Sequence, residues 1–329
     1  MIAGVDIGKC RLGISIYDNN KILEKKIIEF NKEELEKIIK KYKIKEVVCE
    51  YTGIYTIKLL KILKKIDKEI KLYYFDPGFI VSLRKKIIGN KKDDKTDSYF
   101  LSKIFYAFKE EAYELNNFDF ELYELVRQHK IIKKHLSKIK TILSSDEEIF
   151  NYKHLKESAL FLENKKKEIE KEIKKRLSPL YKKIIEQVEG LNYISLAYIL
   201  AETKDIRRFK EVWKFLAYSG VVPITYSSGN KESRTISSKV NKTLKGIFYN
   251  CALGSLRIKN GKMKKIYDKK RKEGKHHFVA IFHVAKRIAR KTYELLNNSG
   301  QAFSPARPTR SWKVEKNKKK GKQQKNPKI

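Results

Sequence analysis

Four acidic side chains in the first hundred residues lie where they could act on one substrate. Asp6 lies in the strand-like segment IAGVDIG, and Glu50 lies in the strand-like segment EVVCEYT. Asp94 and Asp97 open a helix-like segment three residues apart, a spacing that puts both carboxylates on one helix face. Carboxylates gathered at one point repel each other unless a divalent cation binds, and such oxygen ligands suit Mg²⁺ or Mn²⁺. The pattern therefore predicts a metal site for phosphodiester chemistry, where two ions about 4 Å apart serve the attacking and leaving oxygens.

Each of these acids also has a purely structural interpretation. An aspartate two residues before a glycine is common at a strand end, and Asp94 and Asp97 could merely favour the positive end of a helix dipole. Asp93 is a further acid beside them, but a helix directs its side chain away from the face that Asp94 and Asp97 share. The occurrence of these four acids together, on two strands and at the start of one helix, favours the metal site.

The elements that must position these acids alternate between strand-like and helix-like segments over residues 1–108. Three short runs rich in Ile and Val predict three antiparallel strands between residues 2 and 30. The segments that follow predict a helix from the N-cap Asn31, a strand at 46–52, a helix at 55–66, a strand at 69–76 and a helix at 94–108. The order β-β-β-α-β-α-β-α predicts an α/β ribonuclease H-like fold. No GxGxxG follows the first strand to indicate a dinucleotide-binding fold.

The rest of the chain predicts three further parts. Residues 109–185 lack glycine, and their apolar positions among charges of both signs predict two long helices, paired as a hairpin or coiled coil with a break at 144–152. Residues 186–298 predict a mostly helical, all-α domain that contains one unusual loop, PITYSSGNKESRTISSK. Residues 299–329 are rich in Lys, Asn, Gln and Pro and predict a disordered basic tail.

The composition limits the class of partner. The chain of 329 residues has 76 Lys and Arg against 39 Asp and Glu, a net charge of +37, with 41% hydrophobic residues for a core. This surplus indicates a polyanion, above all nucleic acid, and excludes an ordinary small-molecule enzyme with a neutral surface. About two thirds of the surplus lies in residues 186–329, which a uniform codon bias toward lysine would not produce.

The same residues argue against a membrane protein and against a disulfide scaffold. No stretch approaches the ~20 consecutive apolar residues of a spanning helix, and the first residues lack the pattern of a signal peptide. Cys10, Cys49 and Cys251 are odd in number and far apart in the sequence. We therefore expect a location in a reducing cytoplasm.

The N-terminal motifs resemble those of a known enzyme family. AGVDIGK at 3–9, CEYTGIY at 49–55, DP at 76–77 and KDDKTDSYFLS at 92–102 resemble the RuvC-like Asp-Glu-Asp-Asp domain of insertion-sequence transposases, relatives of Piv-type DNA invertases. We adopt the register that aligns Leu101 and Ser102 with the family's Leu-Ala pair. It puts Asp94 and Asp97 in the last two positions of the tetrad.

The C-terminal motifs resemble the second domain of the same family. VEGLNYISLAYILAE at 188–202 is similar to its helix-hairpin-helix-like segment, a module that presents backbone amides to phosphates. DIRRFKEVWKFLAYSGVVPITYSSG at 205–229 and ISSKVNKTLK at 236–245 are similar to its later motifs. In this chain Asn192 replaces the second glycine of the hairpin segment, Ser219 replaces a leucine, and Val240 and Lys245 replace glycine and arginine.

The resemblance implies a DNA recombinase that mobilises its own insertion element. The serine of the family's Ser-Gly loop is its nucleophile, which makes Ser228 the candidate serine nucleophile in this chain. From the residues alone Ser227 is an equal neighbour, and a loop serine is usually only a turn residue. Basic residues on or near the loop would hold phosphates, namely Lys231, Arg234, Lys239, Lys242 and Lys245.

The resemblance also implies partners and a location. Donor and target DNA would pair with a structured guide (bridge) RNA, and dimers would assemble into a tetramer in the prokaryotic cytoplasm, at the nucleoid. Two other functions remain open. One is a Holliday-junction type of structure-specific endonuclease, which would use metal-activated water and leave Ser228 idle. The other is a structural nucleic-acid-binding protein whose acids only cap helices.

Overall fold

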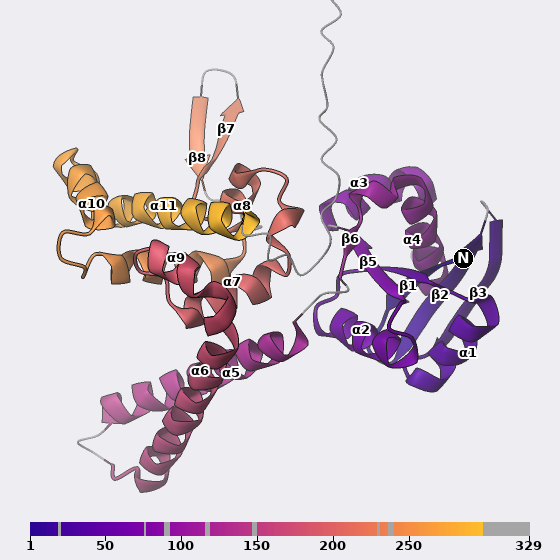
Figure 1. The fold of residues 1–329 in the computed structure, drawn as a ribbon, viewed down its shortest axis with the longest axis horizontal. Helices are drawn as coiled ribbons and strands as arrows, with labels where there is room; N and C mark the ends of the chain where they lie inside the picture. The colour runs from indigo at the N-terminus through magenta and orange to yellow at the C-terminus, as the bar shows by residue number, and fades with distance from the viewer. Residues whose placement is uncertain are drawn as a thin grey trace, which may run out of the picture.

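The computed structural model describes residues 1–18, 21–75, 77–88, 93–115, 119–146, 150–228, 231–235 and 240–298. Within them, an N-terminal part built on a sheet is followed by a mostly helical remainder (Figure 1). This confirms the predicted combination of an α/β part with helical structure. None of the described helices is both long and apolar enough to cross a membrane. The predicted basic tail, residues 299–329, lies outside the described residues.

A six-stranded mixed sheet organises the N-terminal part in the order β3-β2-β1-β4-β5-β6. The first three strands pair antiparallel, β4 and β5 run parallel to β1, and β6 pairs antiparallel at the edge. This is the predicted arrangement of three meandering strands followed by two crossovers. The strands are β1 (Ile2–Ile7), β2 (Arg11–Asp18), β3 (Lys21–Glu29), β4 (Glu46–Glu50), β5 (Lys71–Phe75) and β6 (Tyr113–Glu114).

Helices cover both faces of this sheet. The alternation of β4 sends Val47 and Cys49 into a core with α1 and α2, and sends Val48 into a core with α3 and α4. Asn31 is the N-cap of α1, as predicted, and its side chain accepts a hydrogen bond from the Glu34 backbone at 2.9 Å. The helices are α1 (Lys32–Tyr42), α2 (Ile54–Ile66), α3 (Pro77–Ile88) and α4 (Asp94–Phe108).

Two elements of this part were not predicted. The helix α3 begins at Pro77, a position where the fixed φ and missing N–H of proline cost little, and the strand before it ends at Phe75. The strand β6 has only two residues and therefore carries no periodic pattern of its own. It extends the sheet at its edge by pairing with β5.

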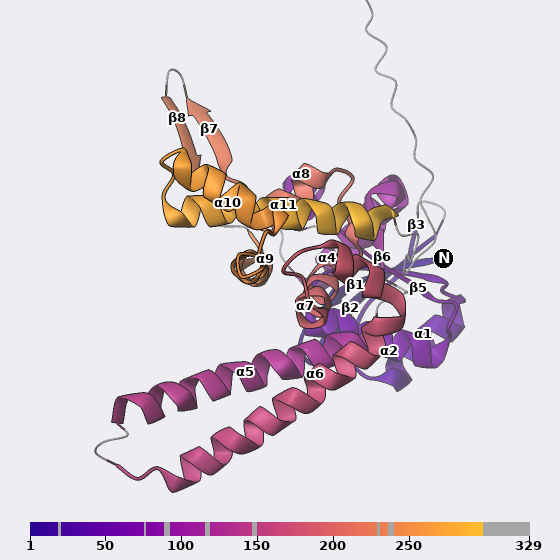
Figure 2. The same cartoon turned by 60° about the vertical axis from the view of Figure 1, so that its left-hand side comes forward.

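Two long helices, α5 (Phe120–Asp146) and α6 (Lys153–Gln187), lead from the sheet to the C-terminal helices and lie side by side (Figure 2). The helix α5 ends within the predicted break at 144–152, and α6 begins at the residue after it. Coiled-coil geometry stays a prediction. After α6 come α7 (Tyr193–Thr203), α8 (Val212–Tyr218), β7 (Ile224–Ser228), β8 (Lys231–Thr235), α9 (Lys242–Ser255), α10 (Lys262–Lys272) and α11 (His277–Asn298), with short 3-10 turns at Lys109–Glu111 and Ile206–Arg208.

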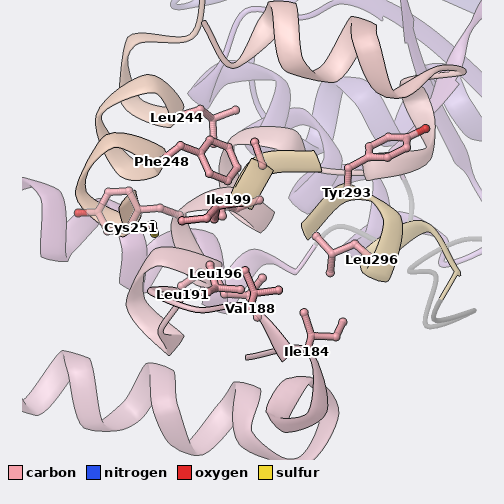
Figure 3. Packing of buried hydrophobic residues seen from close by; sticks show 14 of the residues in the cluster. Ile184, Val188, Leu191, Leu196, Ile199, Leu244, Phe248, Cys251, Tyr293 and Leu296 are labelled. Atoms are coloured by element: carbon pink, nitrogen blue, oxygen red, sulfur yellow. The ribbon is translucent and has the colours of Figure 1, made fainter. Parts of the chain in front are cut away.

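One continuous apolar core joins the long helices to the C-terminal helices. Leu122 and Val126 of α5 belong to the same buried cluster as Phe248 of α9 and Leu296 of α11. Figure 3 shows the meeting of α6, α7, α9 and α11 in this cluster, including Ile184, Leu196, Phe248 and Leu296. Within the segment predicted as a loop, residues 224–228 and 231–235 pair as antiparallel strands, because their Thr, Tyr and Ser residues tolerate an extended backbone.

Candidate functional site

Two neighbouring parallel strands place Asp6 and Glu50 at the same end of the sheet. Val5 of β1 pairs with Cys49 of β4, and the next residue of each strand is one of the two acids. Asp6 and Glu50 fall on the sheet face opposite Val5 and Cys49, which is the face covered by α4. The register of the two strands is therefore enough to place Asp6 and Glu50 at neighbouring positions.

The first turn of α4 supplies the other two acids. Asp93 is its N-cap, and the Asp93 side chain accepts a hydrogen bond from the Thr96 backbone N–H at 2.9 Å. Hydrogen bonds from Thr96 hold the pKa of Asp93 below its usual range. Because Asp93 is committed to the cap, Asp94 and Asp97 are the acids that the first turn leaves for the site.

Two glycines let α4 lie close against the sheet. A Cβ at Gly13, which pairs with Asp6, would fall 2.4 Å from the backbone oxygen of Asp94. A Cβ at Gly4 would fall 2.1 Å from the backbone oxygen of Ser98. Any side chain at either position would lift α4 from β1 and β2. These glycines therefore set the height of the α4 acids above Asp6.

The raised pKa of Asp6 indicates that the four carboxylates lie near one another. Burial is the largest cause that raises the pKa of Asp6, and the charges of Asp97, Asp94 and Glu50 raise it further, to about 6. Each of the other three acids thus acts on Asp6. The cluster carries a large negative charge in a partly buried place, which is the condition that a divalent cation relieves.

An arginine that the sequence did not single out also lies in this cluster. Arg84 of α3 forms an ion pair with Asp97, whose side chain is 16% exposed. Motif and spacing could not reveal Arg84 because the helix that carries it was not predicted. The pair holds the Asp97 carboxylate and offsets part of the cluster's negative charge.

The donor set is that of a hard divalent cation, since all four predicted ligands are carboxylates. Among the described residues, no three metal-ligating side chains are grouped closely enough to hold an ion together. Asp97 is instead paired with Arg84. The four carboxylates suit Mg²⁺ or Mn²⁺ because all of them offer oxygen ligands and because their negative charges act on one another. Binding of an ion would require their oxygens to move closer together.

The structure places the candidate nucleophile on the β7–β8 hairpin and away from the carboxylates. Ser228 is the last residue of β7 and pairs with Lys231, the first residue of β8, while Ser227 pairs with Glu232. The hairpin projects upward from the C-terminal helices and stands apart from the N-terminal sheet (Figures 1 and 2). One chain therefore does not bring Ser228 beside Asp6.

The predicted phosphate-binding residues are only partly brought together. Arg234 lies on β8 and pairs with Thr225, whereas Lys239 lies outside the described residues. Lys242 begins α9, and the Lys245 ammonium lies 5.4 Å from the centre of the Phe282 ring. The predicted basic residues that the structure describes are therefore divided between the strand β8 and the helix α9.

The replacement of a glycine by Asn192 has a local structural reason. Asn192 is the N-cap of α7 and accepts a hydrogen bond from the Ser195 backbone at 2.8 Å. Gly190 has a φ of +81°, and a Cβ there would meet the Cys251 backbone oxygen at 2.1 Å. The turn between α6 and α7 keeps the glycine that packing requires and uses Asn192 to begin the next helix. A helix-hairpin-helix role for this turn stays a prediction.

The residue after Glu50 contacts the C-terminal helices. Lys204, at the end of α7 with a φ of +62°, places its ammonium 2.9 Å from the centre of the Tyr51 ring. The Tyr113 hydroxyl donates to the Arg208 carbonyl at 3.4 Å, and Lys210 pairs with Glu111. A cavity of about 260 Å³ lies at this boundary and is lined by Glu111, Tyr113, Arg208, Phe209, Lys210, Lys214 and Tyr218.

Family comparison agrees with both halves of this arrangement. Residues 3–145 match the DEDD domain model of IS110 transposases, described as Transposase, and this range contains all four carboxylates. Residues 182–268 match the model described as Transposase IS116/IS110/IS902 family, and this range contains the β7–β8 hairpin. No curated protein matches the chain. The chain thus carries both domains of the IS110 family of insertion-sequence transposases and belongs among the enzymes that cut DNA and transfer its strands.

Proposed function

We propose that this transposase cuts and rejoins DNA through Ser228, assisted by a divalent cation that Asp6, Glu50, Asp94 and Asp97 hold. The observation that carries the proposal is the convergence of four carboxylates from β1, β4 and α4, because the charges of Glu50, Asp94 and Asp97 all raise the pKa of Asp6. When bound, Mg²⁺ or Mn²⁺ would stabilise the negative charge that develops on the transferring phosphate.

The proposed step is a phosphoryl transfer to the serine. The Ser228 oxygen attacks the phosphorus, a serine–phosphate ester forms, and the bond to a deoxyribose oxygen breaks. The serine proton passes through the site carboxylates to the leaving oxygen. Lys231, Arg234, Lys239, Lys242 and Lys245 would hold the phosphate backbone during this exchange.

The separation of Ser228 from the carboxylates within one chain has a consequence for assembly. We infer that the serine hairpin of one chain meets the carboxylates of another, so that a complete site needs a dimer or tetramer. The long helices α5 and α6, as a coiled coil, are the proposed element of self-association. The proposal keeps four parts: residues 1–108 for the carboxylates, 109–185 for association, 186–298 for the serine and 299–329 as a basic tail.

A guide RNA that pairs with donor and target DNA belongs to the same proposal. Its support is the net charge of +37, which suits RNA as well as DNA, together with the resemblance of the motifs to those of insertion-sequence transposases. A transposase acts where its DNA lies, so we place it at the nucleoid of a prokaryotic cytoplasm.

The test is to trap a covalent protein–DNA adduct with purified protein, Mg²⁺, guide RNA and labelled donor and target duplexes. We expect an adduct from the natural chain and from Ser227→Ala, but none from Ser228→Ala or Asp94→Asn. An adduct from Ser228→Ala would refute the assignment of the nucleophile. Mixing Ser228→Ala with Asp6→Asn protein should restore part of the yield if the site is shared between chains.

The same separation favours one alternative. An endonuclease that used the carboxylates and water alone would not need the hairpin nearby. It predicts free 5′-phosphate ends, no adduct, and cleavage that survives Ser228→Ala.

A further inference from the structure

The corner between α10 and α11 carries a dense positive charge that the proposed chemistry does not use. Residues 262–276 contain eight Lys and Arg against two acids. No residue of α10 is buried, and every residue from 271 to 279 is exposed. A run of charged residues of this kind is ordinarily only a solvated helix face, so the charge by itself does not identify a binding surface.

A row of aromatic rings supplies that feature. The rings of His276 and Phe278 have centroids 5.6 Å apart and planes 23° apart. Phe278 continues to Tyr249 of α9 at 6.4 Å and 24°, and Tyr249 continues to Phe282 at 5.9 Å. Phe278 is 54% exposed, whereas the apolar side chains farther along α11 are largely buried. An exposed aromatic ring beside cations is a feature on which bases stack.

The row begins close to the base of the serine hairpin. Lys245 lies against the Phe282 ring, and its Cδ lies 3.4 Å from the position of a Cβ on Gly220, a few residues before β7. From there the rings lead along α9 and the start of α11 to the basic corner. The surface is therefore a continuous strip from the hairpin base to α10.

We propose that this strip, made of Tyr249, His276, Phe278, Phe282 and the cations of α10, binds single-stranded DNA. A duplex hides its base faces, whereas a strand released by cutting exposes them to Phe278 and its neighbours. Phosphates of the same strand contact the lysines of α10. The strip thereby holds the strand that cleavage frees. The inference rests on the DNA-cutting function of the family and needs neither Ser228 nor a metal ion.

Binding in EDTA tests the strip without cleavage. The full chain is titrated into a labelled single strand of DNA, into the same sequence as a duplex and into the same sequence as RNA, with fluorescence anisotropy as the measurement. Phe278→Ala should weaken single-stranded DNA binding by about 10-fold and duplex binding much less. Phe278→Trp should restore it. Lys269→Gln should lower the salt dependence of single-strand binding by about 0.7 in the log–log slope.

Phe161 offers a matched control. It is also an exposed phenylalanine, at 60%, with the Lys165 ammonium 5.8 Å from its ring centre, but it lies on α6. Phe161→Ala should leave single-strand binding unchanged. Circular dichroism of Phe278→Ala should match the natural chain because the side chain is exposed.

Three outcomes would overturn the inference. Equal loss of duplex and single-strand binding would make the corner a duplex site, a preference for RNA alone would make it an RNA site, and no loss would make it a solvated face. Ser228→Ala should bind normally in EDTA. Failure of the adduct assay with normal binding to the strip would refute only the proposed function.

Discussion

Gly13→Ala should disable cleavage by displacing a helix while leaving all four carboxylates in the chain. The added Cβ would fall 2.4 Å from the backbone oxygen of Asp94 and 2.8 Å from its carbonyl carbon, where an ordinary contact begins near 3.4 Å. The first turn of α4 or strand β2 must therefore move by about 1 Å. Misplacement of that size at a reacting centre costs on the order of 100-fold in rate.

The stability cost of the same change is separable from its cost in rate. Overpacking of a close contact costs about 1–3 kcal/mol in the free energy of unfolding. We expect the Gly13→Ala protein to fold, and to unfold in urea titrations at a lower midpoint concentration than the natural chain. Single-turnover cleavage of a labelled DNA substrate with Mg²⁺ should then fall about 100-fold at a temperature where both proteins are folded.

Gly246 in α9 is the matched control because a Cβ there meets nothing within 4 Å. Gly246→Ala should raise the free energy of unfolding by about 0.5–1 kcal/mol, since glycine weakens a helix interior, and should leave cleavage unchanged. A folded Gly13→Ala protein that cleaves as fast as the natural chain would show that the height of α4 above Asp6 does not matter.

Three other changes test separate features. Asp6→Asn should raise the melting temperature in EDTA at pH 8, because it removes one charge from a cluster of carboxylates that repel one another. The same change should abolish the stabilisation that Mg²⁺ gives. A lower melting temperature of the variant in EDTA would contradict this electrostatic account. In the native protein only Cys10 should react with a maleimide. Cys49 and Cys251 are buried, and burial raises the pKa of both thiols, so rapid modification of either one would argue against the packing. Gly190→Ala should lower the urea midpoint because its φ is +81° and its Cβ would meet a backbone oxygen; an unchanged midpoint would refute the tight turn.

Much of the carboxylate site could be anticipated because it depends on local rules. Strand alternation predicts which face Asp6 and Glu50 occupy, and helix spacing predicts that Asp94 and Asp97 project together. Asp93 also follows a local rule as an N-cap. Each of these rules depends only on residues that are a few positions apart in the sequence or that lie on two neighbouring strands.

The features that the sequence did not reveal depend on long-range packing. Arg84 reaches Asp97 from a separate helix, and Lys204 reaches Tyr51 across more than a hundred residues. The approach of α4 to Gly13 is visible only once the helix is docked. The β7–β8 hairpin was missed for another reason, since its polar strands show no alternation of apolar and polar residues to mark them.

The core shared by the long helices and the C-terminal helices also constrains how the chain can fold during synthesis. Leu122 and Val126 emerge early, yet the cluster that buries them is completed by Tyr293 and Leu296 near the end of the described chain. Ribosomes deliver the N-terminal part first, so the sheet can form while the base of α5 and α6 still exposes apolar surface. Chains that are still being synthesised should therefore depend on chaperones until α11 has left the ribosome. An early stop within α11 should then yield a product that aggregates, and not a smaller stable protein.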